Sequence, residues 1–243
     1  TGKLFTTLSE GYTGWYAKGN SKTYAIDNIS IRAESIVGRT NVEVTEPFWF
    51  LDDFGENDSG RWVGDKSSFT WDTTNGQLVP TTVNKSMLIP IAKLNQVEIE
   101  TSITIVEGEY RTNGTLILAC QSNTISGSAI QVTGTSLYYV TMNKTGITLG
   151  KNILGVNTVI ASINNTITDG ETVVLKVAWD GRIGNFKLYK NGVQIGDVAG
   201  YTDTTLTHGY CGIGTRFIYP FIPNSVKYNY LQISGTRVYN KPI

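Results

Sequence analysis

Apolar and polar residues alternate along this chain in short runs, with the period of two that β-strands show. The clearest case is VVLKVAWDGRIGNFKLYKNGVQIGD, residues 173–197. Its alternate apolar positions are Val173, Leu175, Val177, Trp179, Phe186, Leu188, Val193 and Ile195. Asp180-Gly181 and Asn191-Gly192 suit tight turns because such turns need positive φ, which Gly, Asn and Asp reach at low cost. The stretch predicts an antiparallel meander.

Similar runs recur through the rest of the chain, separated by breaks rich in Gly, Asn and Ser. They cover residues 97–105, 116–120, 130–132, 138–142 and 226–230. Helical periodicity is nearly absent, and residues 151–163 fit strand and loop as well as a short turn of helix. The pattern predicts an all-β fold, a two-sheet antiparallel β-sandwich of the jelly-roll kind.

A boundary is expected near residues 36–46, which we interpret as a linker that ends at Pro47. Residues 1–35 supply two or three strands, too few to bury a sheet face alone. They are either the C-terminal remnant of a preceding β-sandwich module or an N-terminal β-hairpin extension of the main domain. AIDNISIRAE, residues 25–34, resembles the last strand of small carbohydrate-binding jelly rolls. The jelly roll itself is expected over 47–243.

Composition and charge bear on the partners that we expect. The chain has 243 residues, enough for one large β domain, and its 20 acidic and 20 basic side chains cancel. This balance gives no reason to expect nucleic acid as a partner. No apolar run reaches the roughly 20 residues of a membrane span, so no membrane insertion is expected. The chain starts without Met or a signal peptide, as expected for a piece of a longer protein.

The two cysteines, Cys120 and Cys211, both lie in apolar runs typical of strands. They are either two small buried hydrophobic residues or a disulfide between neighbouring strands. Two cysteines do not identify the redox compartment.

From Phe48 onward the order of motifs resembles the concanavalin A-like lectin/glucanase superfamily, especially its laminin-G-like branch. FWFLDDFGENDSGRWVGDKSSFTWDTTNGQLVP is similar to the opening of that family, with aromatic-Asp-Phe, a polar loop, a Trp and a strand ending in Asn-Gly. Residues 173–197 are similar to its paired strands, and YLQISGTRVYNKPI to its closing strand. The resemblance implies a jelly roll of the type found in phage tail and receptor-binding proteins and in secreted bacterial multidomain proteins.

Catalysis is not expected. Glucanases of this superfamily place carboxylates at alternate positions of one strand, so that they flank the glycosidic bond. Glu98 and Glu100 alternate in this way, but Ser102 and Thr104 follow where a further carboxylate would stand. His208 is the only histidine, which leaves the usual triads and His-rich metal sites without partners. A glycoside hydrolase that uses Glu98 and Glu100 remains the alternative.

A structural Ca²⁺ is a second hypothesis. Asp52, Asp53 and Asp58 gather the oxygen ligands that Ca²⁺ prefers, although their spacing is not that of an EF-hand. Related carbohydrate-binding modules hold Ca²⁺ with a further Asp from the last strand, and the last strand here reads Asn229-Tyr230-Leu231-Gln232 without one. A solvated acidic turn is the alternative.

Glycan sites combine aromatic faces with polar groups for the hydroxyls. Trp179, Phe54 and Phe186 are expected in the core. Adjacent strand residues point to opposite faces, so one of Tyr138 and Tyr139 is expected to face outward. Residues 216–223 contain two prolines, which favours a loop or edge. The candidate ligand-binding residues are Tyr138, Tyr139, Arg216, Tyr219, Phe221 and Trp62.

Together these features predict a non-catalytic carbohydrate-binding module, extracellular or on a virion, such as the receptor-binding part of a phage tail fibre. Its expected partners are bacterial cell-surface polysaccharide and other virion subunits, with a homotrimer that would strengthen weak sites by multivalency. A structural or assembly module of a virion, which docks other subunits, is the alternative from a different class.

Overall fold

The computed structural model describes residues 30–31, 41–82, 84–106, 112–217 and 225–242. These residues form antiparallel strands and two short 3-10 helices, η1 (Ser59–Arg61) and η2 (Lys66–Ser68). The strands are β1 (Ser30–Ile31), β2 (Asn41–Asp52), β3 (Val63–Gly64), β4 (Phe69–Asp72), β5 (Gln77–Pro80), β6 (Ser86–Ile105), β7 (Thr112–Cys120), β8 (Ser136–Met142), β9 (Gly146–Ile153), β10 (Val156–Asn164), β11 (Thr172–Asp180), β12 (Asn185–Lys190), β13 (Val193–Ile195), β14 (Tyr201–Thr202), β15 (Gly209–Phe217) and β16 (Val226–Pro242).

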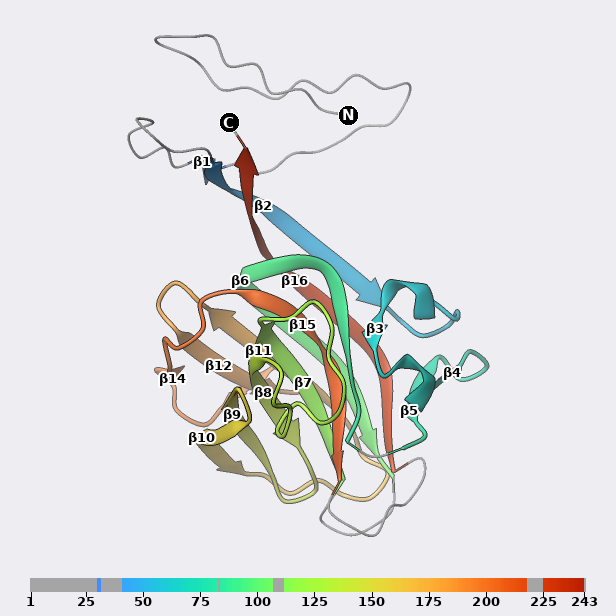
Figure 1. Cartoon of the computed structure of the whole chain (residues 1–243). Helices are drawn as coiled ribbons and strands as arrows, with labels where there is room; N and C mark the ends of the chain where they lie inside the picture. The colour runs from blue at the N-terminus through green and yellow to red at the C-terminus, as the bar shows by residue number, and fades with distance from the viewer. Residues whose placement is uncertain (1–29, 32–40, 83, 107–111, 218–224, 243) are drawn as a thin grey trace, which may run out of the picture.

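The long strand β6 belongs to two sheets (Figure 1). Its first half pairs with β15 and completes a first sheet in the order β10-β9-β8-β7-β15-β6. Its second half pairs with β16 and β11 in a second sheet, which β2 and β12 extend on either side. One core cluster draws on both sheets, for example on Leu118 and Val140 of the first and Ile99 and Leu231 of the second. The predicted all-β jelly-roll sandwich is therefore confirmed.

The strands of the meander over residues 173–197 form as predicted, but the first turn takes its positive φ at Gly184 (67°) and not at Gly181. Val193 is 68% exposed and so does not lie on the buried face that alternation predicted. Strands β11 and β12 pair with Trp179 opposite Phe186, and both side chains are buried in the core, as is Phe54. The turn that follows β12 has positive φ at Asn191 (49°) and Gly192 (79°). These are the angles of a type I′ turn, which suits the twist of a hairpin.

A corner in β6 separates its two halves. Against β15 the register jumps so that Cys211 lies opposite Ile89 but Gly209 lies opposite Leu94. The extra residues of β6 include Pro90, which has no N–H to donate and so fits a break in the ladder. The next residue, Ile91, is left 50% exposed. This corner becomes one wall of the candidate site.

A second, smaller core covers part of the outer face of the first sheet. Ile125, Ala129 and Ile130, from the segment between β7 and β8, pack with Ile117 and Tyr139 of the sheet. Cys120 lies in this smaller core, whereas Cys211 lies in the main one, and both thiols are free and buried. The two cysteines are therefore small buried residues, and they do not form the disulfide that was the alternative prediction.

Strands β2 and β16 leave the body of the sandwich together as a ribbon (Figure 1). Their pairing runs from Leu231 opposite Asp52 to Pro242 opposite Asn41. Residues 41–46 of the predicted linker thus belong to β2, because β16 supplies them with a hydrogen-bonding partner. β1 pairs with the same part of β2. The remainder of the predicted N-terminal module and linker lies outside the described residues.

Candidate functional site

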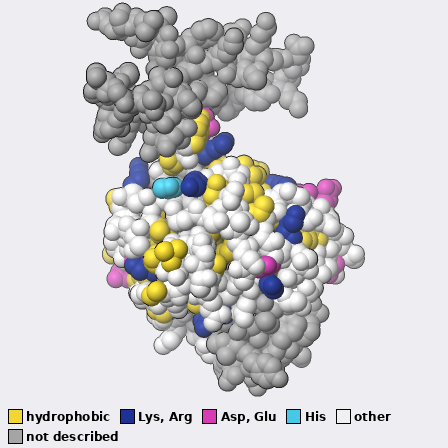
Figure 2. Space-filling view, in the orientation of Figure 1, with side chains coloured by type: hydrophobic (Ala, Val, Ile, Leu, Met, Phe, Trp, Pro, Cys, Tyr) yellow, Lys and Arg dark blue, Asp and Glu magenta, His cyan; other side chains and the backbone are white. Residues whose placement is uncertain are grey.

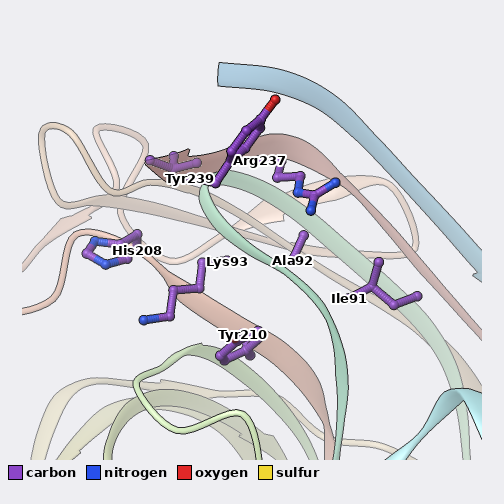
Figure 3. Close-up of a pocket in the computed structure, with 8 residues that line it drawn as sticks. Ile91, Ala92, Lys93, His208, Tyr210, Arg237 and Tyr239 are labelled. Carbon is purple, nitrogen blue, oxygen red and sulfur yellow. The ribbon is translucent and has the colours of Figure 1, made fainter. Parts of the chain in front are cut away.

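A pocket of about 390 Å³ opens at one end of the sandwich, beside the β6 corner (Figure 3). It is lined by Ile91, Ala92, Lys93, His208, Tyr210, Arg237, Val238 and Tyr239. These residues come from the β6 corner, from the start of β15 with the residue before it, and from β16. We call this hollow the end pocket. Its volume lies within the range of roughly 300–1,000 Å³ that is usual for small-molecule sites.

Strand periodicity brings two of these side chains to the pocket. Leu231 and Ile233 of β16 are buried in the core, and alternation carries the same face on to Arg237 and Tyr239. Arg237 and Tyr239 lie beyond the end of the core. The inward-facing side chains of this part of β16 therefore lie beside the β6 corner instead of packing against the other sheet. Residues with an apolar stem or ring and a polar tip suit such a boundary.

Cations lie over aromatic rings in and beside the end pocket. Lys93 Nζ is 5.8 Å from the ring centroid of Tyr210, and Arg237 Cζ is 5.1 Å from that of Tyr239. The Tyr239 hydroxyl donates a hydrogen bond to Glu46 (2.6 Å). Burial, followed by this contact with a carboxylate, raises the pKa of Tyr239 to about 12, so the hydroxyl stays protonated and neutral near pH 7.

His208 completes the pocket at the end of the β14–β15 loop. Its Nδ1 is 3.1 Å from the hydroxyl of Thr207. Its carbonyl oxygen accepts a hydrogen bond from Gln121 Nε2 (2.6 Å), which ties the loop to the residue after β7. Figure 2 shows a His side chain together with basic and hydrophobic side chains near the upper rim of the described body.

Three of the predicted ligand-binding residues are wrong, because Tyr138, Tyr139 and Trp62 are buried. Tyr138 and Tyr139 do point to opposite faces of β8. The face of Tyr139 is covered by the smaller core, however, and its hydroxyl donates to Asn157 (2.5 Å). Tyr138 donates to Asp203 (2.7 Å) from within the main core. All three are framework residues.

Of the remaining predicted ligand residues, only Arg216 lies within the described part of the chain. Arg216 is half-buried and lies near the C-terminal end of β15, whereas Tyr210 lies near its N-terminal end. It does not line the end pocket. Tyr219 and Phe221 lie outside the described residues.

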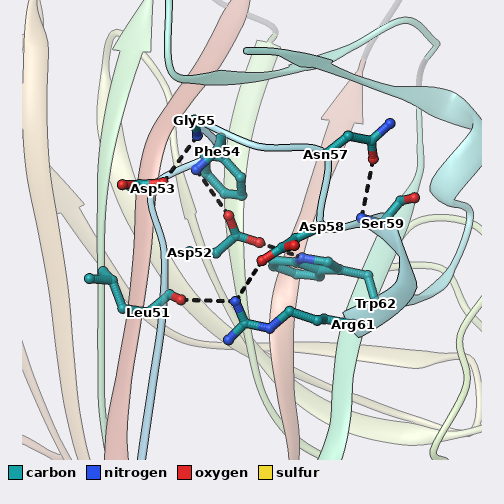
Figure 4. Close-up of polar contacts among 10 residues, drawn as sticks. All are labelled: Leu51, Asp52, Asp53, Phe54, Gly55, Asn57, Asp58, Ser59, Arg61 and Trp62. Atoms are coloured by element: carbon teal, nitrogen blue, oxygen red, sulfur yellow. Dashed lines mark hydrogen bonds and ion pairs between the residues drawn. The ribbon is translucent and has the colours of Figure 1, made fainter.

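The acidic loop, residues 52–62, is held together by its own hydrogen bonds (Figure 4). Asp52 accepts from Trp62 Nε1 (2.8 Å) and from the Phe54 amide (2.9 Å). Asp58 forms an ion pair with Arg61 (2.8 Å), which also donates to the carbonyl oxygen of Leu51. Burial raises the pKa of Asp52, and the hydrogen bond from Trp62 opposes that shift.

These contacts bear on the predicted calcium site. Both oxygens of Asp52 have protein donors, Asp53 accepts from the Gly55 amide (3.0 Å), and Asp58 is paired with Arg61. Within the described ranges no three His, Cys, Asp or Glu side chains are grouped so as to hold a metal ion. Each of the three carboxylates thus has a partner within the chain, and bound calcium stays a prediction.

Glu98 and Glu100 lie on the outer face of the second sheet, away from the end pocket. Glu98 pairs with Lys176 (2.7 Å), and Glu100 accepts from the Tyr230 hydroxyl (2.7 Å). Glu98 also lines a second hollow of about 390 Å³ on this face, together with Asp180, Asn185 and Lys187. Asp180 accepts three hydrogen bonds from Arg182, two from the guanidinium and one from the backbone amide. The glucanase-like pair therefore stands on a sheet surface with partners of its own.

Two antiparallel sheets that share a bent strand and pair their first and last long strands define a double-sheet jelly roll. This is the concanavalin A-like lectin/glucanase fold, as the resemblance of the motifs implied, and solved structures agree. Carbohydrate binding module CBM66 from Bacillus subtilis matches with a TM-score of 0.51 and 17% identity, over 74% of this chain and 95% of its own. A β-glucanase from Bacillus licheniformis matches with 0.55 and 10%, over 76% and 97%.

A third similar structure is the winged bean acidic lectin in complex with methyl-α-D-galactose. It has a TM-score of 0.54 and 10% identity, over 80% of this chain and 100% of its own. At such identities the likeness establishes the fold alone. No family model matches the sequence, and no curated protein matches it.

Sequence reasoning missed the residues of the end pocket. Two signals pointed to it. Pro90 interrupts an apolar strand pattern, which marks a bulge or corner. Arg237 and Tyr239 continue the alternate positions that Leu231 and Ile233 begin, which predicts polar tips where the core ends. Nothing in the sequence reveals that the β14–β15 loop brings His208 to the same place.

Proposed function

We propose that this chain is a non-catalytic carbohydrate-binding module that recognises a surface glycan through the end pocket. The single observation that carries the proposal is the pocket itself, where two tyrosines and three nitrogen-bearing side chains meet at the mouth of the sandwich. Rings offer apolar faces to sugar C–H groups, and the polar tips suit hydroxyls. The fold is shared with a carbohydrate binding module and a galactoside-bound lectin, which supports the same function.

We further propose a setting outside the cell or on a virion, as the receptor-binding part of a phage tail fibre that recognises bacterial polysaccharide. The support is compositional, since only 16% of the residues are charged. A homotrimer would raise the avidity of a weak site by multivalency. No helix among the described residues is long and apolar enough to cross a membrane. Light scattering tests the trimer, and a monomer at working concentration would refute it.

Binding is tested with a glycan array followed by titration of the best ligand into wild-type protein and two variants. Tyr210→Ala and Tyr239→Ala should each weaken binding at least tenfold, because each removes one ring from the pocket. Tyr189→Ala is a matched control, since Tyr189 also carries a lysine over its ring (5.6 Å) but lies on β12. If no glycan binds while circular dichroism shows an intact β fold, the proposal fails.

The hydrolase alternative is tested on Glu98. If oligosaccharides incubated with the wild-type protein are not cleaved, the module is non-catalytic as proposed. Cleavage that disappears in a Glu98→Gln variant would instead assign the hollow on the second sheet as an active site. Glu56→Gln is the control carboxylate, because Glu56 is exposed in the acidic loop and lines neither hollow.

Assembly with other subunits is a second candidate function. One observation favours it: Trp49, on the outer face of the sheet-edge strand β2, is 64% exposed, and Leu51 on the same face is also exposed. Large apolar side chains on an edge strand favour contact with another chain. A Trp49→Ser variant that lowers the oligomeric state or blocks co-assembly, with glycan binding retained, would support this function.

A further inference from the structure

The chain has four cation–π pairs within its described residues, and they divide into two kinds. Arg61 lies over Phe50 (4.3 Å) and Lys176 over Tyr189 (5.6 Å), and each of these cations also has a carboxylate partner, Asp58 or Glu98. The other two pairs are Lys93 over Tyr210 and Arg237 over Tyr239. Both belong to the end pocket.

Lys93 and Arg237 lack an ion-pair partner of this kind among the described residues. No ion pair within 4 Å joins either of them to an Asp or Glu of that part of the chain. The cross-strand neighbour of Arg237 is Glu46, but the carboxylate of Glu46 accepts the Tyr239 hydroxyl (2.6 Å). None of the eight lining residues is acidic. The pocket is thus lined by positive charge in a chain whose net charge is zero.

The two charges occupy different parts of one hollow. In Figure 3, Lys93 extends between His208 and Tyr210, whereas Arg237 lies beside Ala92 and Ile91. An ion that fills a single point would not use both. A chain with an anionic group on more than one unit would, with a flat ring beside each charge to pack against a sugar. The guanidinium fork also matches the two oxygens of a carboxylate or sulfate.

We propose that the end pocket selects an anionic saccharide, one whose sugar units carry carboxylate or sulfate groups. This inference rests on the proposed function and names the class of glycan. A neutral sugar would leave Lys93 and Arg237 without a counter-charge in a partly closed hollow, while an anionic one supplies it. Charge complementarity of this kind gives specificity and speeds association.

The test compares ligands that differ only in charge. Polygalacturonate is titrated beside its fully methyl-esterified form, and dextran sulfate beside dextran. We expect the charged member of at least one pair to bind at least tenfold more tightly than its neutral partner, and added salt to weaken that binding. The pair that responds distinguishes carboxylate from sulfate.

Substitutions of Lys93 and Arg237 test whether the preference for an anionic ligand arises in the end pocket. Lys93→Ala and Arg237→Ala should each weaken binding of the anionic ligand at least fivefold, and Arg237→Lys should fall between Arg237→Ala and wild type because it keeps the charge but loses the fork. Lys187→Ala is the matched control, since it removes one lysine charge from β12 outside the end pocket. It should leave binding unchanged.

The outcomes separate this inference from the function on which it rests. Equal binding of charged and neutral partners, or binding confined to neutral glycans, would overturn the anionic selectivity and leave glycan recognition standing. A loss in Lys187→Ala equal to that in Lys93→Ala would also overturn it, because the attraction would then be unspecific. Failure of every glycan to bind an intact protein would overturn both.

Discussion

The acidic loop and the end pocket both combine aromatic rings with basic side chains, but only the loop also contains carboxylates. In the loop, Trp62 donates a hydrogen bond to Asp52, and Arg61 forms an ion pair with Asp58, so both carboxylates have partners within the loop. In the pocket, Lys93 and Arg237 lie over tyrosine rings and have no carboxylate of the described chain within 4 Å. The charges of the loop are paired within the loop, whereas Lys93 and Arg237 of the pocket form no ion pair with a described carboxylate.

Residue type alone therefore does not separate framework from binding site. A buried aromatic residue with a polar tip is stabilised by an internal partner, because an unmade hydrogen bond in the interior is costly. Trp62, Tyr138 and Tyr139 each have such a partner. A side chain that keeps its polar tip available must lie where water or a ligand can reach it, as at the mouth of the sandwich.

We expect the greatest loss of stability from substitution of a framework residue of the acidic loop. Trp62→Ala should lower the free energy of unfolding by about 3–5 kcal/mol, since it opens a large cavity and removes a donor from Asp52. Urea unfolding followed by circular dichroism measures it. Trp49→Ala is the matched control and should stay within about 0.5 kcal/mol, because that ring is 64% exposed. Equal losses in the two variants would contradict a framework role for Trp62.

A smaller effect on stability is expected at Asp203 and Asp52, two carboxylates that each accept a hydrogen bond from a buried aromatic side chain. Burial raises the pKa of Asp203, but hydrogen bonds from Lys151, Thr205 and Tyr138 outweigh it, so the pKa lies below its ordinary value. Asp203 therefore stabilises the fold fully above its unfolded pKa of about 3.9, and this contribution is lost as the pH falls through the folded pKa. Asp203→Asn should cost about 1.5–3 kcal/mol at pH 7 and less near pH 3.

The contribution of Asp52 to stability depends on pH in the opposite direction, because burial raises the pKa of Asp52. The folded state holds the proton more tightly than the unfolded state, so stability declines as the pH rises from about 4 through the raised pKa. The stability of Asp52→Asn relative to wild type should therefore improve with rising pH. Unfolding titrations from pH 3 to 7 measure both variants, and the same pH trend in the two would refute this assignment.

The sequence was sufficient for the fold because the fold depends on local patterns. Alternation over 173–197 and the Asn191-Gly192 turn specify strands and a hairpin by themselves. The site depends on tertiary placement. Alternation correctly put Tyr138 and Tyr139 on opposite faces, but it could not reveal that residues 121–135 fold back over one of them. Nor could it reveal that the β6 corner and the β14–β15 loop would meet at Arg237.

The smallest expected effect on stability belongs to the end pocket, where the effect on binding should be large. Lys93→Ala and Arg237→Ala each remove a cation from the face of a ring, which contributes about 0.5–1 kcal/mol at accessible sites. We expect unfolding free energies within about 1 kcal/mol of wild type, measured as for Trp62→Ala. Because functional groups held ready for a ligand contribute little to folding, stability and binding should respond separately here. An Arg237→Ala loss as large as that of Trp62→Ala would make the pocket another piece of framework and remove the contrast with the acidic loop.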